Sequence, residues 1–178
     1  MGRLVACTLR GMRAYLSLGS NVGDRLANLQ AAVNFVDLRA GRVSKISRVY
    51  ETAPLYVLDQ AAFYNAVIEI ETDLEPLALL SRIKEIEYEV GRIPRQRWGP
   101  REIDVDILCL VDGRNNQIRV NVKELTLPHP HMAERRFVID PMKEMAESLL
   151  PKTGLDKKKL MLQHVKVVED AKLSVHRD

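Results

Sequence analysis

The chain has 178 residues, of which 46% are hydrophobic and 29% charged, and its formal net charge is +3. This composition indicates a globular protein with a substantial core and excludes a disordered chain. The small net charge gives no basic footprint for nucleic acid, the two cysteines exclude a disulfide framework, and no apolar run approaches the roughly 20 residues of a membrane span. We therefore expect a cytoplasmic protein without nucleic-acid or membrane partners.

The first predicted elements are a strand and a helix that follow a short N-terminal extension. Residues 1–12 form the expected extension, because the apolar run there is too short for a secretory signal. Residues 13–21 alternate apolar side chains on one face, which predicts a strand. Asp24 is placed to cap a helix over residues 25–37, and Gly41 ends that segment.

Two strands, a second helix and a further strand come next. Residues 42–54 and 63–72 are predicted strands joined by a loop. Residues 75–91 predict a helix, because apolar residues recur there at helical spacing and a glycine closes the segment. After a loop, residues 102–111 predict a strand in which Cys109 is expected to be a small buried hydrophobe.

The order β-α-β-β-α-β is that of the split βαβ or ferredoxin-like pattern, an α+β fold whose antiparallel sheet carries both helices on one face. Residues 141–150 suggest a further short helix, which belongs with the tail to C-terminal additions. The chain contains no internal repeat and no low-complexity linker. Residues 13–178 are therefore expected to form a single domain.

Two aspartates interrupt the apolar strand near its start. Asp104 and Asp106 are two positions apart, so both side chains point to the same face of the sheet. The preceding loop, residues 91–101, contains several arginines around Trp98. Paired carboxylates suit Mg²⁺ and guanidinium groups suit phosphate, so the combination predicts a polyphosphate site. The alternative is a solvated strand end beside ordinary surface charges.

Two further clusters could contribute to a site. The segment 125–137 contains His129 and His131, which alternate like zinc ligands, but also arginines suited to a nucleotide phosphate; a plain surface loop is the third alternative. The strand that begins at Phe63 places Asn65 on the same face as that ring. An aromatic plate beside an amide could stack a flat heterocycle and read its edge, or could simply belong to the core.

The three clusters together resemble a known enzyme family. "RWGPREIDVDIL" (97–108), "YLSLGSNVGDR" (15–25), "YETAPLYVLDQAAFYNAV" (50–67) and "LTLPHPHMAERRFVIDP" (125–141) are similar in kind and order to motifs of the 6-hydroxymethyl-7,8-dihydropterin pyrophosphokinases of folate biosynthesis. The resemblance covers about residues 13–150. It implies transfer of the β,γ-pyrophosphoryl unit of ATP to a reduced pterin, with release of AMP.

The resemblance also implies roles for individual residues. Asp104 and Asp106 would hold two Mg²⁺ ions and, with Arg92 and Arg101, form the catalytic set. The implied pterin-binding residues are Thr52, Leu55, Phe63, Asn65, Trp98 and Phe137. The implied ATP-binding residues are Glu87, Arg92, Arg101, Ile107, Thr126, His129 and Arg135. ATP and the reduced pterin are the expected small-molecule partners, and a monomer is favoured.

The match to the family has departures, and other functions compete with it. Pro130 stands where some members have a tyrosine that meets phosphate, Glu124 where an arginine can occur, and Lys84 where some have a glutamine. An RNA-binding ferredoxin-like module is a rival, although only 5% of the residues are aromatic. A metal-dependent nucleotidyl transferase is another, which would release pyrophosphate instead of AMP.

Overall fold

The computed structural model describes residues 11–55, 57–96, 98–152 and 156–175. The strands are β1 (Met12–Ser20), β2 (Arg42–Ile46), β3 (Tyr50–Thr52), β4 (Phe63–Thr72), β5 (Asp104–Val111), β6 (Gln117–Ile118), β7 (Val120–Asn121), β8 (Thr126–Leu127) and β9 (Val165–Val167). The helices are α1 (Arg25–Arg39), α2 (Pro76–Val90), α3 (Arg136–Ala146) and α4 (Lys157–Met161), with short 3-10 turns η1 (Met132–Glu134) and η2 (Glu147–Leu149).

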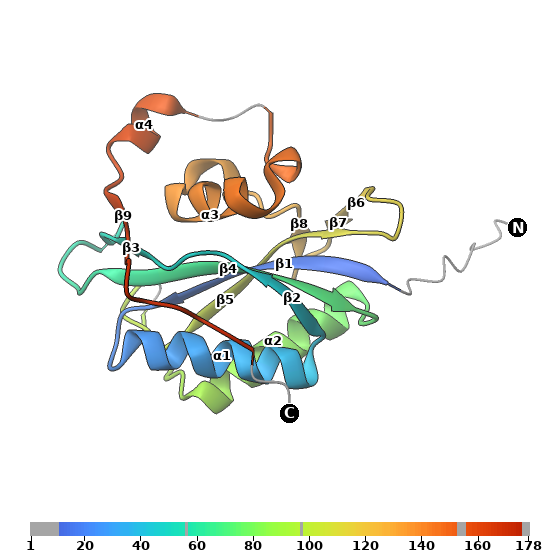
Figure 1. The fold of residues 1–178 in the computed structure, drawn as a ribbon, viewed down its shortest axis with the longest axis horizontal. Helices are drawn as coiled ribbons and strands as arrows, with labels where there is room; N and C mark the ends of the chain where they lie inside the picture. Colours follow the sequence, from blue (N-terminus) through green and yellow to red (C-terminus); the bar gives the residue numbers. More distant parts are fainter. Residues whose placement is uncertain (1–10, 56, 97, 153–155, 176–178) are drawn as a thin grey trace, which may run out of the picture.

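A seven-stranded sheet is the centre of the described structure. Its order is β6-β5-β1-β4-β3-β9, β2 also pairs with β4, and the strand pairs recorded in it are antiparallel. Helices α1 and α2 lie on one face, and α3 lies on the opposite face (Figure 1). The predicted order of strands and helices is thus present, with α1 and α2 on one face as expected (Figure 1), and α3 and the tail are added to it.

The face under α1 and α2 carries the larger core. Alternating β1 residues Ala14, Leu16 and Leu18 are fully buried there against the two helices. Helix α1 begins where Asp24 accepts a hydrogen bond from Ala27 N at 3.0 Å, as the sequence predicted. The remaining buried apolar residues of the two helices are Leu29, Ala32, Val33, Val36, Leu79, Ile83 and Ile86.

The face under α3 carries a second core, and a β-bulge in β5 helps to build it. Tyr15 pairs with Cys109 and Leu16 pairs with Ile107, so Leu108 is the extra residue. Because of the bulge, Leu108 and Cys109 both face α3, where they pack with Val138 and Met142 of the helix. Cys109 is fully buried, which confirms its predicted place in the core.

Two predicted elements have different bounds in the structure. The single strand expected over residues 42–54 is divided into β2 and β3, because the Ser47 hydroxyl accepts a hydrogen bond from Val67 N at 2.9 Å where the strand pairing is interrupted. The helix expected over residues 141–150 begins five residues earlier, at Arg136. Pro141 therefore lies inside α3 and is buried.

The tail closes one edge of the sheet and continues onto the other face. Strand β9 pairs with β3, and the chain then runs down to α1 (Figure 1). There the Gln30 side chain donates to Ser174 O at 2.7 Å and accepts from Ser174 N at 3.1 Å. The extension expected at residues 1–12 lies outside the described residues up to residue 10. Within the described ranges, no helix combines the length and apolar character needed to cross a membrane.

Candidate active site

The α3 face of the sheet contains a cleft of about 510 Å³ at the end of the sheet where β5 starts. Its walls come from β1, β3, β4, β5, the loop after Gly91 and the segment that leads into α3. The predicted site residues that line it are Thr52, Leu55, Phe63, Arg92, Trp98, Arg101, Asp104, Asp106, His129, Arg135 and Phe137. One cleft thus brings together all three sequence clusters.

The strand register explains why the two aspartates open on this cleft. Residues paired across antiparallel strands point to the same face. Gly19 pairs with Asp104 on one side and with Asn65 on the other, while Ser17 pairs with Asp106. Because Gly19 has no side chain, it leaves space between Asp104 and Asn65 on this face of the sheet. A Cβ atom at Gly19 would lie 3.1 Å from Asn65 Oδ1.

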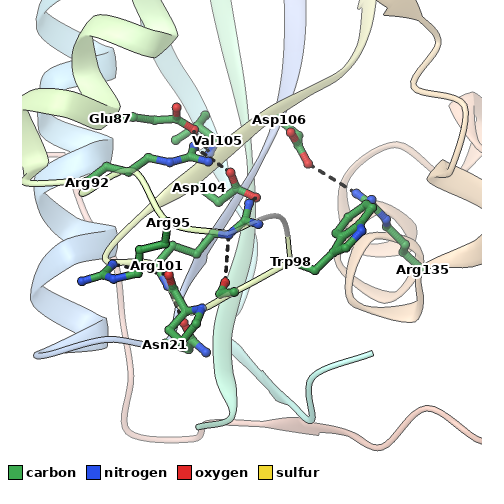
Figure 2. Close-up of polar contacts among 12 residues, drawn as sticks. Asn21, Glu87, Arg92, Arg95, Trp98, Arg101, Asp104, Val105, Asp106 and Arg135 are labelled. Carbon is green, nitrogen blue, oxygen red and sulfur yellow. Dashed lines mark hydrogen bonds and ion pairs between the residues drawn. The ribbon is translucent and has the colours of Figure 1, made fainter. Parts of the chain in front are cut away.

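Asp104 is held by two arginines of the loop. Arg92 Nη1 lies 2.8 Å from Oδ1, and Arg101 Nη1 donates to Oδ2 at 2.7 Å (Figure 2). Both arginines belong to the segment that follows α2, which ends at Gly91 in the left-handed conformation (φ 106°) that favours glycine. The turn at Gly91 is what directs Arg92 back toward the sheet.

Asp106 faces a different arginine. Arg135 Nη1 donates to Asp106 Oδ2 at 3.3 Å, and the guanidinium carbon lies 5.8 Å from the centre of the Phe137 ring. Arg135 is only 6% exposed, and its Nε is buried without a hydrogen-bond partner among the described residues. A buried, unsatisfied N–H in a cleft lined by arginines is suited to an anionic ligand.

Glu87 lies beneath the loop and joins it to the strand. It is 2% exposed, accepts from Val105 N at 2.7 Å, pairs with Lys84 Nζ at 2.9 Å and contacts Arg92. Burial raises the pKa of its carboxyl above the ordinary value, against the opposing effects of Lys84, Val105 N and Arg92. Arg92 is thus shared between Glu87 and Asp104, each of which has a second cationic partner, Lys84 for Glu87 and Arg101 for Asp104.

His129 is anchored by backbone contacts beside the aspartates. Its N–H donates to the carbonyl of Leu108, the bulged residue of β5, at 2.7 Å. Its Nδ1 accepts from His131 N at 3.2 Å, so the proton of the neutral ring is on Nε2. Burial lowers the pKa of the His129 ring, with Arg135 and His131 acting in the same direction and Asp106 and Asp104 opposing it.

The loop after Gly91 is joined to a second loop across the cleft. Gln60 donates to Trp98 O at 3.0 Å and accepts from Asn21 Nδ2 at 3.0 Å. Asn21 in turn exchanges two bonds with the backbone of Arg101, at 2.8 and 3.0 Å (Figure 2). Asn21 and Gln60 therefore fix the loop after Gly91 relative to the loop that contains Gln60.

The side chains of the cleft fit a hard cation that takes some of its oxygen ligands from the protein and the others from a bound phosphate. Among the described residues, no group of three or more His, Cys, Asp and Glu side chains could hold a metal ion by itself. Asp104 and Asp106 provide carboxylate oxygens only, which Mg²⁺ accepts together with oxygens of a bound polyphosphate. The rings of His129 and His131 lie 5.9 Å apart, and the described residues offer them no third zinc ligand.

A family model described as 7,8-dihydro-6-hydroxymethylpterin-pyrophosphokinase (HPPK) matches residues 15–147. The chain belongs to the HPPK family. The family and enzyme class expected from the sequence motifs are therefore confirmed.

Individual relatives agree with the HPPK match. A Bacillus subtilis protein named 2-amino-4-hydroxy-6-hydroxymethyldihydropteridine pyrophosphokinase is 42% identical over 137 residues, which are 76% of this chain and 79% of the relative. The Pneumocystis carinii folic acid synthesis protein fol1 is 41% identical over 142 residues, 79% of this chain but only 18% of that protein. The similarity thus extends to part of a much longer chain.

The fold is shared with HPPK structures as well. A solved Plasmodium falciparum HPPK-DHPS structure superposes with a TM-score of 0.61 at 16% identity, covering 79% of this chain and 43% of that one. At that identity the likeness concerns the fold alone. It confirms the predicted ferredoxin-like α+β class.

Four residues that the HPPK resemblance assigned to substrate lie outside the cleft wall. Asn65 is buried beneath it and donates to Thr52 Oγ1 at 2.8 Å. Glu87 is below the loop, Ile107 is part of the core under α1 and α2, and Thr126 is exposed on β8. Asn65 and Glu87 contact residues that line the cleft. The assignment of Ile107 and Thr126 to ATP binding stays a prediction.

The sequence reasoning missed several residues of the HPPK cleft. Asn21 and Gln60 fix the loops, and Gly19 lines the cleft. Lys84 and His131 line it as well, although the sequence indicated them only as a departure from the family and as a possible zinc ligand. The partners of Asn21 are 39 to 80 positions away, so no local spacing could reveal them. Gly19 could have been noticed, because a glycine inside a strand often marks a close approach.

Proposed function

We propose that this protein transfers the pyrophosphoryl group of ATP to the hydroxymethyl oxygen of 6-hydroxymethyl-7,8-dihydropterin and releases AMP. The hydroxyl oxygen attacks the β-phosphorus, the bond from that phosphorus to the oxygen bridging the α-phosphorus breaks, and the hydroxyl proton is released. The observation that carries the proposal is that Asp104 and Asp106 share one cleft with arginines from two chain segments. Family membership supports the same reaction.

The acid and arginine groups are assigned to the triphosphate. Asp104 and Asp106 would hold two Mg²⁺ ions, which supply charge neutralisation to the phosphates when bound. Arg92 and Arg101 are counter-ions of Asp104 in the structure described here, and they would turn to phosphate oxygens. Arg135 would receive phosphate at its unsatisfied Nε.

The part of the cleft next to these groups is assigned to the pterin. Phe63 and Phe137 line it and offer aromatic faces for stacking. Thr52 and Leu55 line the cleft and would read the ring edge through backbone groups, and Asn65 would do so after exchanging its bond with Thr52. Trp98 would close over both substrates with its loop and exclude water that could otherwise hydrolyse ATP.

The nucleotide end is assigned to the groups around His129. Its Nε2–H would donate to a phosphate oxygen, since Nδ1 is already occupied by His131 N. Glu87, Ile107 and Thr126 would lie on the adenosine side. His131 lines the cleft next to Pro130 and would supply the contact that a tyrosine makes in some family members.

Product analysis tests this proposal directly. The protein is incubated with Mg²⁺, ATP and 6-hydroxymethyl-7,8-dihydropterin, and nucleotide products are separated by chromatography. AMP formation that depends on the pterin is expected. Release of inorganic pyrophosphate with transfer of the nucleotide would instead indicate a nucleotidyl transferase and overturn the proposal.

The assignment of the two acids needs variants with a matched control. Asp104→Asn and Asp106→Asn are each expected to lower turnover more than about a hundredfold, because charge stabilisation in a closed site is usually a large contribution to catalysis. Asp170→Asn removes an equal charge from an exposed tail position and is expected to leave turnover unchanged. Near-normal rates in the first two variants would refute the metal assignment.

A further inference from the structure

The C-terminal segment lies outside the region matched by the family model, yet it contacts the candidate active site. The match ends at residue 147, whereas α4 and β9 follow at residues 157–161 and 165–167. In Figure 1 this segment runs beside the start of α3 and then down the edge of the sheet next to β3. Gln163 lies between the two elements and is only 8% exposed.

The side-chain amide of Gln163 grips the backbone on both sides of Arg135. Its Oε1 accepts from Arg136 N at 2.8 Å, and its Nε2 donates to Glu134 O at 2.7 Å. The carbonyl of Gln163 also accepts from Arg136 Nη1 at 3.1 Å. One residue thus fixes the peptide groups immediately before and after an active-site arginine.

This grip replaces a cap that the local sequence does not provide. The first N–H groups of a helix have no partner within the helix and need an outside acceptor. Arg135 is the residue before α3, and it makes no side-chain capping bond. Gln163 supplies the acceptor for Arg136 N from 27 positions further along the chain.

The orientation of Arg135 depends on the backbone at that point. Its guanidinium reaches Asp106 at 3.3 Å, and its unsatisfied Nε is buried at the cleft wall. A rotation of the peptides at residues 134–136 would be amplified along the arginine side chain. Small misplacements of a binding group are costly in catalysis, because the reacting atoms must be held close to their productive positions.

The strand that follows Gln163 acts on the other wall of the cleft. Val165 of β9 pairs with Thr52 of β3, and β3 is only three residues long. Thr52 lines the cleft and accepts the amide of Asn65 at 2.8 Å. Residues 163–167 therefore hold both the start of α3 and the strand opposite it.

We propose that Gln163 is a positioning residue that aims Arg135 at Asp106 and at the substrate phosphates. The proposal rests on the proposed function, because the consequence is a change in the handling of ATP. Gln163 touches no reacting atom, so its effect passes through Arg135. The tail is then part of the catalytic unit, although the family model ends before it.

A double-mutant cycle on the full-length chain tests this coupling. Gln163→Ala is expected to lower kcat/KM for ATP about tenfold and to leave the KM for the pterin within about twofold. In an Arg135→Ala background, the same substitution is expected to have less than about a twofold effect, because the residue through which it acts is gone. Gln30→Ala is the matched control. It also removes two hydrogen bonds between a side-chain amide and the backbone of the tail, at Ser174, far from the cleft.

The outcomes separate positioning from plain stabilisation. Equal losses from Gln163→Ala with and without Arg135, or an equal loss in Gln30→Ala, would overturn the proposal. Should Gln163→Ala unfold at the assay temperature, Gln163→Glu is measured in its place; it keeps the acceptor for Arg136 N and loses the donor to Glu134 O. In Gln163→Glu, a loss of kcat/KM for ATP that is smaller than about tenfold and that requires Arg135 supports the proposal. Unchanged kinetics in this variant refute it. If wild type itself forms no AMP, the proposed function has failed instead.

Discussion

Gly19 offers a sharp test of the proposed pterin-binding part of the cleft. It lies in β1 between Asn65 of β4 and Asp104 of β5, and it lines the cleft. In Gly19→Ala, the added Cβ would be 3.1 Å from Asn65 Oδ1 and 3.8 Å from Phe63 Cδ1. Asn65 would have to retreat by a few tenths of an ångström.

The size of the effect follows from what holds Asn65. Its amide is buried beneath the cleft and donates to Thr52 Oγ1 at 2.8 Å, so a shift moves it away from the position at which it would hydrogen-bond the pterin edge. Weakening one buried hydrogen bond costs about 1 kcal/mol, which corresponds to about a fivefold loss of affinity. We expect the KM and Kd for the pterin to rise by about that factor, with ATP affinity nearly unchanged.

Steady-state kinetics with each substrate varied, and calorimetric titration of the pterin, measure this effect. Gly113→Ala is the matched control, because a Cβ at Gly113 would meet nothing within 4 Å. An unchanged pterin affinity in Gly19→Ala would show that Asn65 does not border the pterin. An equal loss of ATP affinity would show that the substitution does not act on the pterin alone.

Two further predictions concern titrating groups. Arg95 lowers the pKa of Glu102 to about 2, so the carboxylate stabilises the fold above its unfolded pKa, and this contribution is lost as pH falls from about 5 toward 2. The Tm difference between wild type and Glu102→Gln should therefore be largest near pH 6 and shrink through that window, unlike that of the exposed Glu169→Gln; a constant difference would contradict the pairing. Burial raises the pKa of the Cys109 thiol from 9.0 to about 12, so the native protein should hold about a thousandfold less Cys109 thiolate at pH 8 than the unfolded chain. Peptide mapping after iodoacetamide treatment measures this, and rapid native labelling of Cys109 would refute its burial.

Local signals predicted the regular elements well. Asp24, which caps α1, and Gly91, which ends α2, both act through their own immediate backbone. The face shared by Asp104 and Asp106 follows from strand alternation and agrees with the register of β5. These features need no knowledge of distant residues.

The features that could not be predicted depend on distant partners or on local rules that packing overrides. The helix suggested at residues 141–150 begins five residues earlier, where Gln163 provides the acceptor that the local sequence lacks. Ser47 divides a predicted strand because its hydroxyl meets Val67, twenty residues away. The loop-binding roles of Asn21 and Gln60 were invisible for the same reason.

The extra residue at Leu108 decides which layer each half of β5 serves. If the same residues were paired in regular alternation, without a bulge at Leu108, Cys109 and Val111 would turn toward α1 and α2, and Leu110 toward α3. The inserted position lets one strand present acids at its beginning and an apolar floor at its end on the same side. Deleting Leu108 would therefore make the pairing regular without exchanging the two faces, because Ile107 and Cys109 already pair with neighbouring residues of β1, and α3 would lose only the contacts of Leu108.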